Sequence, residues 1–338
     1  MKFAELKLRV FLSCLCLNVI VVMMLPGAGI GGTIIAFGDS LTEGCGVPGQ
    51  YYYDCGSQGR YDTYPLYLEQ IFNNDGDATT IKNFGIGGEQ TSEGVNRIDS
   101  VLNDVCNQCV DYFLLMEGTN DLFHHVDEAT VYYNLSTMVD KIRAKGIQPI
   151  LATITPDPDS PWKNITLMNN YIRNLAVEKD VFLVDQYNAL AGNWYWYTHP
   201  QGCYEDQLHP NTYGFQDMAA VWYDSLLHLK ALTTSSTAYP TSALVKGSVD
   251  VSTGAVSGLA FQYGEDCKMD KTVTLVPSTA SGTGRVSVQT QISNLKPETM
   301  YYYRFIATQN GSIINGGTKS FITPGESLTW LKLLLGTP

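Results

Sequence analysis

Residues 34–44 read IIAFGDSLTEG, an apolar run that ends abruptly in Gly-Asp-Ser. The run is typical of a buried strand, and Thr42 and Glu43 then open a segment of different character. Glycine accepts a positive φ and an aspartate side chain bonds nearby backbone, so this corner suits a tight turn. The stretch alone indicates a strand and a turn, and it leaves the serine at position 40 to be explained by the rest of the chain.

The alternation of short apolar runs with amphipathic segments continues to about residue 230. The expected strands are 33–37, 80–84, 110–116, 149–154 and 181–185. Helical spacing of apolar residues appears at 131–142 and 165–175, and a closing helix is expected near 211–230. Strands alternating with helices indicate βαβ units and a parallel sheet covered on both faces. We therefore expect an α/β domain over 30–232, a three-layer α/β/α fold with a five-stranded parallel sheet in a flavodoxin-like arrangement.

The character of the chain changes after Leu232. Residues 233–241 read TTSSTAYPT, a polar stretch that predicts a linker. Residues 242–324 then alternate as strands without helical periodicity, which predicts a C-terminal all-β sandwich. Its expected strands are 243–251, 258–264, 272–277, 285–292 and 301–308. Residues 325–338 form an apolar tail with no predicted place.

The N-terminus has the layout of a secretory signal over residues 1–29. Lys2, Lys7 and Arg9 precede an apolar run at 10–25, and small residues follow. An uncleaved anchor is the alternative, because the run is only slightly short of a membrane span. The formal charge of −12 argues against nucleic acid or an anionic membrane as partner, since both repel an acidic surface. We expect a secreted or periplasmic protein.

Cysteine usage agrees with export. Six cysteines follow the signal segment, and in an exported chain they favour disulfides over metal sites. Proximity in sequence suggests that Cys45 pairs with Cys55 and Cys106 with Cys109, while Cys203 and Cys267 could bridge the two domains; spacing leaves the connectivity open. The adjacent His124 and His125 lack further ligands at convincing spacing. The sequence therefore predicts neither a metal nor a cofactor.

Polar residues gather at the ends of the predicted strands. In an open parallel sheet, ligands bind beyond the carboxyl ends of the strands. The first strand ends at Ser40, the second runs into GIGG at 85–88, and the third runs into EGTND at 117–121. The last loop before the closing helix carries Asp206 and His209. We expect all four segments to meet at one edge of the sheet.

Together these residues are the parts that acyl transfer needs. Ser40 becomes a nucleophile once the neutral His209 accepts its proton, and Asp206 can hold that imidazole in the required tautomer. The tetrahedral intermediate carries an oxyanion, which the backbone N–H groups of Ser40 and Gly88 and the side-chain amide of Asn120 can receive.

The same segments resemble the SGNH, or GDSL-type, hydrolase superfamily. GDSLTEG resembles its first block with Ser40 as nucleophile, and GIGGEQT resembles its second with Gly88 aligned to the oxyanion glycine. GTND, with Asn120, resembles the third block, and DQLHP, with Asp206 and His209, resembles the fifth. The resemblance spans 33–230 in the correct order, and Gln90 departs from the usual Thr or Ser. It implies a serine esterase that works through an acyl-enzyme.

A second resemblance concerns the C-terminal region. LKPETMYYYRF at 295–305 is similar to the turn and tyrosine-corner strand of a fibronectin type III domain. Another type of β-sandwich is the alternative. The resemblance implies a spacer or a module for attachment to a cell surface or glycan.

Two aromatic clusters are expected to flank the nucleophile. The substrate-pocket candidates are Asp39, Tyr51, Tyr52, Tyr53, Trp194 and Trp196. Aromatic faces stack on sugars or wall an acyl pocket, and with the acidic charge they favour a short-acyl or carbohydrate acetyl ester. The alternatives are a lipase, lysophospholipase or thioesterase, or a non-catalytic glycan-binding or adhesion protein on the same scaffold. The sequence does not indicate an oligomeric state.

Overall fold

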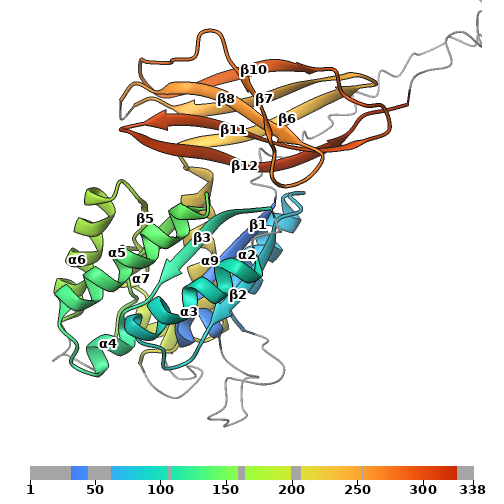
Figure 1. The fold of residues 1–338 in the computed structure, drawn as a ribbon. Coiled ribbons are helices and arrows are strands. Elements are labelled where there is room, and N and C mark those ends of the chain that lie inside the picture. Colours follow the sequence, from blue (N-terminus) through green and yellow to red (C-terminus); the bar gives the residue numbers. More distant parts are fainter. Residues whose placement is uncertain are drawn as a thin grey trace, which may run out of the picture.

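The computed structural model describes residues 32–44, 62–105, 109–158, 164–198, 207–252 and 254–325, which form an α/β domain and a β-sandwich (Figure 1). The strands of the first are β1 (Thr33–Gly38), β2 (Thr80–Gly85), β3 (Val110–Met116), β4 (Gln148–Ala152) and β5 (Phe182–Val184). They are all parallel and lie in the order β2-β1-β3-β4-β5. This order is that of a flavodoxin-like sheet, so the predicted fold class is confirmed.

Helices cover both faces of this sheet. They are α1 (Ser40–Glu43), α2 (Tyr64–Asn74), α3 (Thr91–Asp104), α4 (Thr119–Phe123), α5 (Glu128–Ala144), α6 (Ile165–Glu178), α7 (Gln186–Leu190), α8 (Trp194–Thr198) and α9 (Thr212–Leu227). Alternate residues of β1 point to opposite faces: Ile34 packs in a core with α2 and α9, and Ile35 packs in a core with α3, α5 and α6. The result is the expected three-layer arrangement.

The β-sandwich consists of two antiparallel sheets. Its strands are β6 (Ala231–Tyr239), β7 (Ser242–Asp250), β8 (Ser257–Gly264), β9 (Lys271–Thr274), β10 (Arg285–Ser293), β11 (Met300–Gln309) and β12 (Ser312–Ile322). One sheet has the order β10-β7-β6 and the other β12-β11-β8-β9. Tyr301, Tyr303 and Phe305 alternate inward from β11 into the core between the sheets.

The predicted linker at 233–241 is wrong, because most of it is β6. This strand pairs antiparallel with β7, and Ala231, Leu232 and Thr233 at its start are buried. Beyond them, its Ser and Thr residues alternate between partly covered and exposed positions, so a polar composition conceals an ordinary strand. Strand β12 was also missed, since its Gly316-Gly317 pair is typical of a turn.

The disulfide described by the structure joins Cys109 to Cys267. The predicted pair Cys106–Cys109 is therefore wrong, and so is the suggested bridge between Cys203 and Cys267, although Cys267 does link the two domains. Cys109 directly precedes β3, where the loop that follows β8 in the sandwich approaches the α/β domain. The predicted pair Cys45–Cys55, Cys106 and Cys203 lie outside the described residues, as do the signal segment and residues 326–338 of the tail.

The sandwich contacts the amino-terminal edge of the parallel sheet. Asp111, near the start of β3, accepts hydrogen bonds from the Thr318 N–H at 2.7 Å and the Thr318 hydroxyl at 2.6 Å. Gln148, the first residue of β4, accepts from the Asn315 N–H at 3.3 Å. The carboxyl-terminal edge lies at the opposite end of the same strands (Figure 1). Across the described ranges, no helix combines the length and apolar character needed to cross a membrane.

Candidate active site

Ser40 lies at the carboxyl end of β1 as the first residue of α1. Gly38 makes this corner possible, because a Cβ there would come within 2.2 Å of the Met116 carbonyl oxygen on β3. Asp39 is the N-cap, and its Oδ1 accepts the Leu41 N–H at 2.9 Å. Strand end, turn and cap together place Ser40 at the carboxyl-terminal edge of the sheet, between the ends of β2 and β3.

His209 reaches Ser40 across 169 residues of sequence, with its Nε2 at 2.8 Å from the Ser40 Oγ. The loop that carries His209 is held on both sides. The Trp194 indole N–H donates to the Gln207 carbonyl at 2.8 Å, and Asn211 caps α9 by accepting the Gly214 N–H. Asp206, the predicted orienting carboxylate, lies outside the described residues.

The predicted oxyanion donors lie on both sides of Ser40. Since β1 pairs with β2 and β3, the loop that carries Gly88 and the first turn of α4, which carries Asn120, flank the serine. Asn120 Nδ2 donates to the Glu89 carbonyl at 2.9 Å, which ties the two segments together. Within the part of the chain that the structure describes, the N–H groups of Ser40 and Gly88 donate no hydrogen bond. These donors can therefore receive an anionic oxygen.

The three glycines after β2 have different surroundings. A Cβ on Gly85 would fall 2.1 Å from the Glu43 backbone nitrogen, so this glycine allows α1 to pack on β2. The Gly87 N–H donates to Glu43 Oε2 at 2.6 Å. Gly88 has a φ of +79° and nothing within 4 Å of a built Cβ. Of the three, Gly88 has both the open side and the uncommitted N–H that an oxyanion donor needs.

Two substrate-pocket candidates are buried. Asp39 is 1% exposed and Trp194 is 2% exposed, so neither forms a pocket wall, and that prediction is wrong for both. Burial raises the pKa of Asp39 to about 6, while the Leu41 N–H and the nearby His209 act in the opposite direction. Tyr51, Tyr52, Tyr53 and the side chain of Trp196 lie outside the described residues.

Sequence reasoning missed a charged group beside Gly88 and Asn120, made of the buried Glu89 and Glu117 and the partly buried Arg97. Glu89 and Glu117 are 4% and 1% exposed, and Arg97 forms an ion pair with Glu89. One signal was available in the sequence. Arg97 lies three residues after Gly94 and four before Val101, both on the buried face of α3, so helical spacing directs a charge inward.

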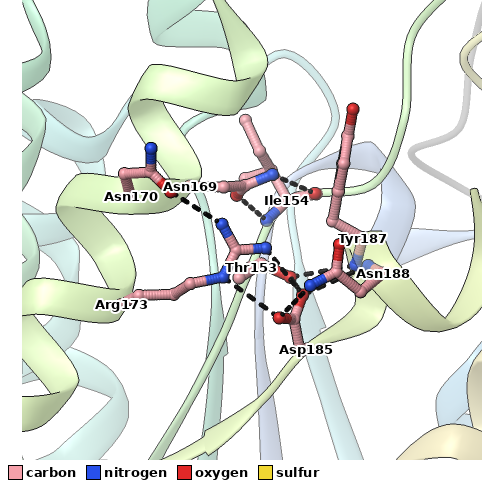
Figure 2. A network of polar contacts seen from close by, with 8 residues as sticks. All are labelled: Thr153, Ile154, Asn169, Asn170, Arg173, Asp185, Tyr187 and Asn188. Carbon is pink, nitrogen blue, oxygen red and sulfur yellow. Dashed lines mark hydrogen bonds and ion pairs between the residues drawn. The ribbon is translucent and has the colours of Figure 1, made fainter.

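A second polar network occupies the far side of the same sheet edge, after β4 and β5 (Figure 2). Arg173 Nε and Nη2 each lie 3.0 Å from an oxygen of Asp185, and the Thr153 hydroxyl donates to the same carboxylate at 3.1 Å. Partial burial raises the pKa of Asp185, but hydrogen bonds from Arg173 and the Asn188 N–H together outweigh it and hold the pKa below its ordinary value. This network fixes the loop after β4 to the loop after β5.

The described residues contain no group of three or more His, Cys, Asp and Glu side chains arranged to hold a metal ion. His124 packs its ring edge-on against Phe123, with 5.5 Å between the ring centroids.

Comparison with known proteins places this geometry in context. No curated protein matches the chain significantly. A lipolytic protein of the G-D-S-L family from Veillonella parvula is 21% identical, with a TM-score of 0.46 and coverage of 58% of this chain and 99% of its own. The esterase EstA from Pseudoalteromonas is 20% identical (TM-score 0.46, 58% and 96% covered), and an acetyl xylan esterase from Geobacillus stearothermophilus is 17% identical (TM-score 0.47, 58% and 95% covered).

The sequence profile of the GDSL-like Lipase/Acylhydrolase family matches residues 36–216, which include Ser40, Gly88, Asn120 and His209. The matched region is more than half of the chain and coincides with most of the α/β domain. The protein is therefore a member of the GDSL-like lipase/acylhydrolase family.

Proposed function

We propose that this protein is a serine esterase that hydrolyses carboxylic esters through an acyl-enzyme. The observation that carries the proposal is the 2.8 Å contact between Ser40 Oγ and His209 Nε2, at a sheet edge where uncommitted N–H donors flank the serine. A hydroxyl held on an imidazole nitrogen is in place to lose its proton as it attacks a carbonyl carbon.

The proposed reaction has two halves. His209 accepts the Ser40 proton as Oγ attacks, and the Ser40 and Gly88 N–H groups with the Asn120 amide receive the negative oxygen. The intermediate collapses, the alcohol leaves with the proton from His209, and the acyl group stays on Ser40. Water, deprotonated by His209, then attacks the acyl carbonyl carbon, and His209 returns the proton to Ser40 Oγ as the acid leaves. Asp206 is proposed to orient the imidazole.

We further propose a short-acyl or carbohydrate acetyl ester as the substrate. The acidic net charge of −12 favours an uncharged substrate over an anionic phospholipid surface. Long-chain lipids, lysophospholipids and thioesters are the competing substrates. Secretion through residues 1–29 is part of the proposal, and the Cys109–Cys267 disulfide supports it because disulfides persist in oxidising compartments.

The C-terminal domain is proposed to be a fibronectin type III-like module for attachment to a cell surface or glycan. Its division into three-stranded and four-stranded sheets supports this proposal. So does the Tyr301 hydroxyl, which accepts the Lys296 N–H at 3.0 Å, the contact expected of a tyrosine corner.

The decisive experiment compares wild type with Ser40→Ala on 4-nitrophenyl acetate and on a long-chain homologue. Ser40→Ala is expected to lower kcat by about 10⁵-fold to 10⁶-fold with an unchanged circular dichroism spectrum. A fluorophosphonate probe is expected to label wild type at Ser40 and not the variant. Near wild-type turnover by Ser40→Ala would overturn the serine mechanism, and an inactive, unlabelled wild type would favour a non-catalytic binding role.

A further inference from the structure

The charged group of the buried Glu89 and Glu117 and the partly buried Arg97, here called the anchor cluster, lies next to the loop that carries Gly88. Glu89 is the next residue after Gly88, Arg97 comes from α3, and Glu117 follows β3. Arg97 Nε donates to Glu89 Oε1 at 2.6 Å, and Nη2 donates to Glu89 Oε2. A forked pair of this kind fixes orientation as well as distance. Removing the Glu89 carboxylate from water is unfavourable unless a cation compensates it, and Arg97, whose side chain is 19% exposed, supplies that cation.

The guanidinium is itself held in place from the other side. Arg97 Cζ lies 3.9 Å from the centroid of the Phe37 ring on β1, a cation–π contact. Phe37 is fully buried in the core beneath α3, and its ring packs against Phe113. Strand β1 leads directly into Ser40. The contact between Phe37 and Arg97 therefore links the arginine that holds Glu89 to the strand that positions the nucleophile.

Glu117 is the third member of the cluster and is almost fully buried. Burial, and secondarily the adjoining Glu89 carboxyl, raise the pKa of Glu117 well above its ordinary value. Glu117 therefore holds its proton more strongly than an exposed glutamate does. Gly94 on α3 leaves the space for this carboxyl, since a Cβ there would lie 2.5 Å from Glu117 Oε2.

Glu89 connects the cluster to the reaction site through its backbone. Its carbonyl accepts the Asn120 amide at 2.9 Å, and its peptide bond joins it to Gly88. A shift of the Glu89 side chain therefore moves two of the three donors expected to receive the oxyanion. Misplacement of such groups by about 1 Å costs on the order of 10²-fold in rate.

We propose that Arg97 is a positioning residue of the oxyanion hole: through Glu89 it fixes the backbone next to Gly88, and with it the Gly88 N–H and the amide of Asn120 that receive the negative oxygen. This inference rests on the proposed esterase function. It assigns to the anchor cluster a role in the transition state, which a purely structural ion pair does not have.

The test is Arg97→Met, which replaces the arginine by an unbranched apolar side chain and so removes both donors to Glu89. On 4-nitrophenyl acetate we expect kcat to fall about 10-fold to 100-fold, with KM changed by less than about threefold, because the lost interactions act on the transition state. Arg97→Lys is expected to recover only part of the loss, since a lysine cannot form the fork.

The matched control is Arg173→Met, which removes the other forked Arg–carboxylate pair at the same sheet edge (Figure 2). Arg173→Met is expected to lower the melting temperature about as much as Arg97→Met does. It should leave kcat within about twofold of wild type, because Arg173 holds the loops after β4 and β5. An equal kcat loss in this control would overturn the positioning role in favour of general loosening.

A double-mutant cycle separates positioning from stability. If Arg97 acts through Asn120, then Arg97→Met combined with Asn120→Ala loses at least about tenfold less than the product of the two single losses. Full additivity in folded proteins, or wild-type kcat in Arg97→Met, would overturn the inference. If Arg97→Met does not fold, Glu89→Gln replaces it in the double-mutant cycle with Asn120→Ala, since Glu89→Gln removes the charge but keeps one acceptor for Arg97. Ser40→Ala is measured in parallel: its retained activity would remove the proposed function, whereas an inactive Ser40→Ala beside a fully active Arg97→Met removes only the positioning role.

Discussion

Asp39 carries a charge next to the proposed base as well as capping α1. Its Oδ1 is committed to the Leu41 N–H, and its carboxyl is fully enclosed and within electrostatic reach of His209. Because burial raises the pKa of Asp39 to about 6, it is neutral in mildly acidic solution and ionised above that pH. Once ionised, it attracts the imidazolium that forms as His209 takes the Ser40 proton.

Asp39→Asn is therefore expected to change the pH profile of the reaction. Asn caps a helix as well as Asp does, so the fold persists. At pH 8, kcat/KM should fall about tenfold, which corresponds to about 1.4 kcal/mol of lost imidazolium stabilisation. At pH 5, where Asp39 is already mostly protonated, the loss should be under about threefold. A profile measured with a soluble acetate ester checks this, and a uniform loss at every pH would contradict it.

At the scale of single residues, the sequence predicts what depends on local order along the chain. Ser40 at a strand end and the segments with Gly88 and Asn120 could be placed because parallel strands end at one edge. Helical spacing indicates the orientation of Arg97 on α3, but its partner Glu89 depends on how the loop after β2 packs, and the burial of Trp194 depends on the α9 core, so no motif predicts either contact. The roles of Asp206 and the Tyr51–Tyr53 cluster stay predictions.

At the scale of elements, the bounds of a helix or strand can be predicted where its apolar residues follow a single clear pattern along the chain. All seven residues of β3 are buried, and the apolar face of α5 repeats at helical spacing, so both were expected at nearly their observed bounds. Strands β6 and β12 were missed because Thr and Ser in β6 and the Gly-Gly pair in β12 hide the apolar-polar alternation typical of a strand. Both are strands because they pair with β7 and β11. A strand at the edge of a sheet needs few apolar residues, so composition alone does not reveal it.

Helix α3 offers a prediction at this scale, because it contains a glycine on its buried face. Helix propensity favours Gly94→Ala by about 1 kcal/mol. The new Cβ would instead meet both carboxyl oxygens of Glu117, at 2.5 Å and 2.9 Å. We expect net destabilisation by about 1–3 kcal/mol, as for overpacked sites, in urea denaturation. Ser100→Ala, at an exposed position of α3, is the control and should be neutral within about 0.5 kcal/mol. A more stable Gly94→Ala would show that Glu117 moves freely.

At the scale of the whole molecule, the contact between the two domains could not be predicted, since it joins residues some 200 positions apart. Its centre is Asp111, whose carboxyl accepts two hydrogen bonds from Thr318. Burial raises the pKa of Asp111 from 3.8 to about 6, while the Thr318 donors act in the opposite direction. Folded protein therefore holds this proton more tightly than unfolded chain does, and the contribution of Asp111 to stability decreases as pH rises from about 4 to about 6.

The free energy of unfolding of Asp111→Asn is expected to increase relative to that of wild type as the pH rises from about 4 to about 6. The amide keeps an acceptor for the Thr318 N–H and carries no charge, so the variant is free of the cost of burying an ionised carboxylate above pH 6. The free energy of unfolding of both proteins, measured by urea denaturation at pH 4, 5, 6 and 7, gives the difference. A difference that is independent of pH would contradict the raised pKa of Asp111.

The last prediction follows from the placement of the sandwich at the amino-terminal edge of the parallel sheet. Its described contacts involve the starts of β3 and β4, whereas Ser40 and His209 meet at the carboxyl-terminal edge. A chain that ends at Leu232 keeps Leu229 and Leu232, which are both buried in the core of the α/β domain. It loses the Cys109–Cys267 link and the donors to Asp111, so its melting temperature should be lower.

On a soluble acetate ester, this shortened chain should keep kcat/KM within about threefold of the full chain, because no described contact of the sandwich reaches the site. On an insoluble acetylated polysaccharide it should lose more, since an attached module raises effective concentration at a surface without touching the chemistry. The comparison requires both substrates and a circular dichroism spectrum of each protein. Native secondary structure with more than about tenfold loss on the soluble ester, about 1.4 kcal/mol of transition-state stabilisation, would instead mean that the sandwich helps to build the site from the opposite edge of the sheet.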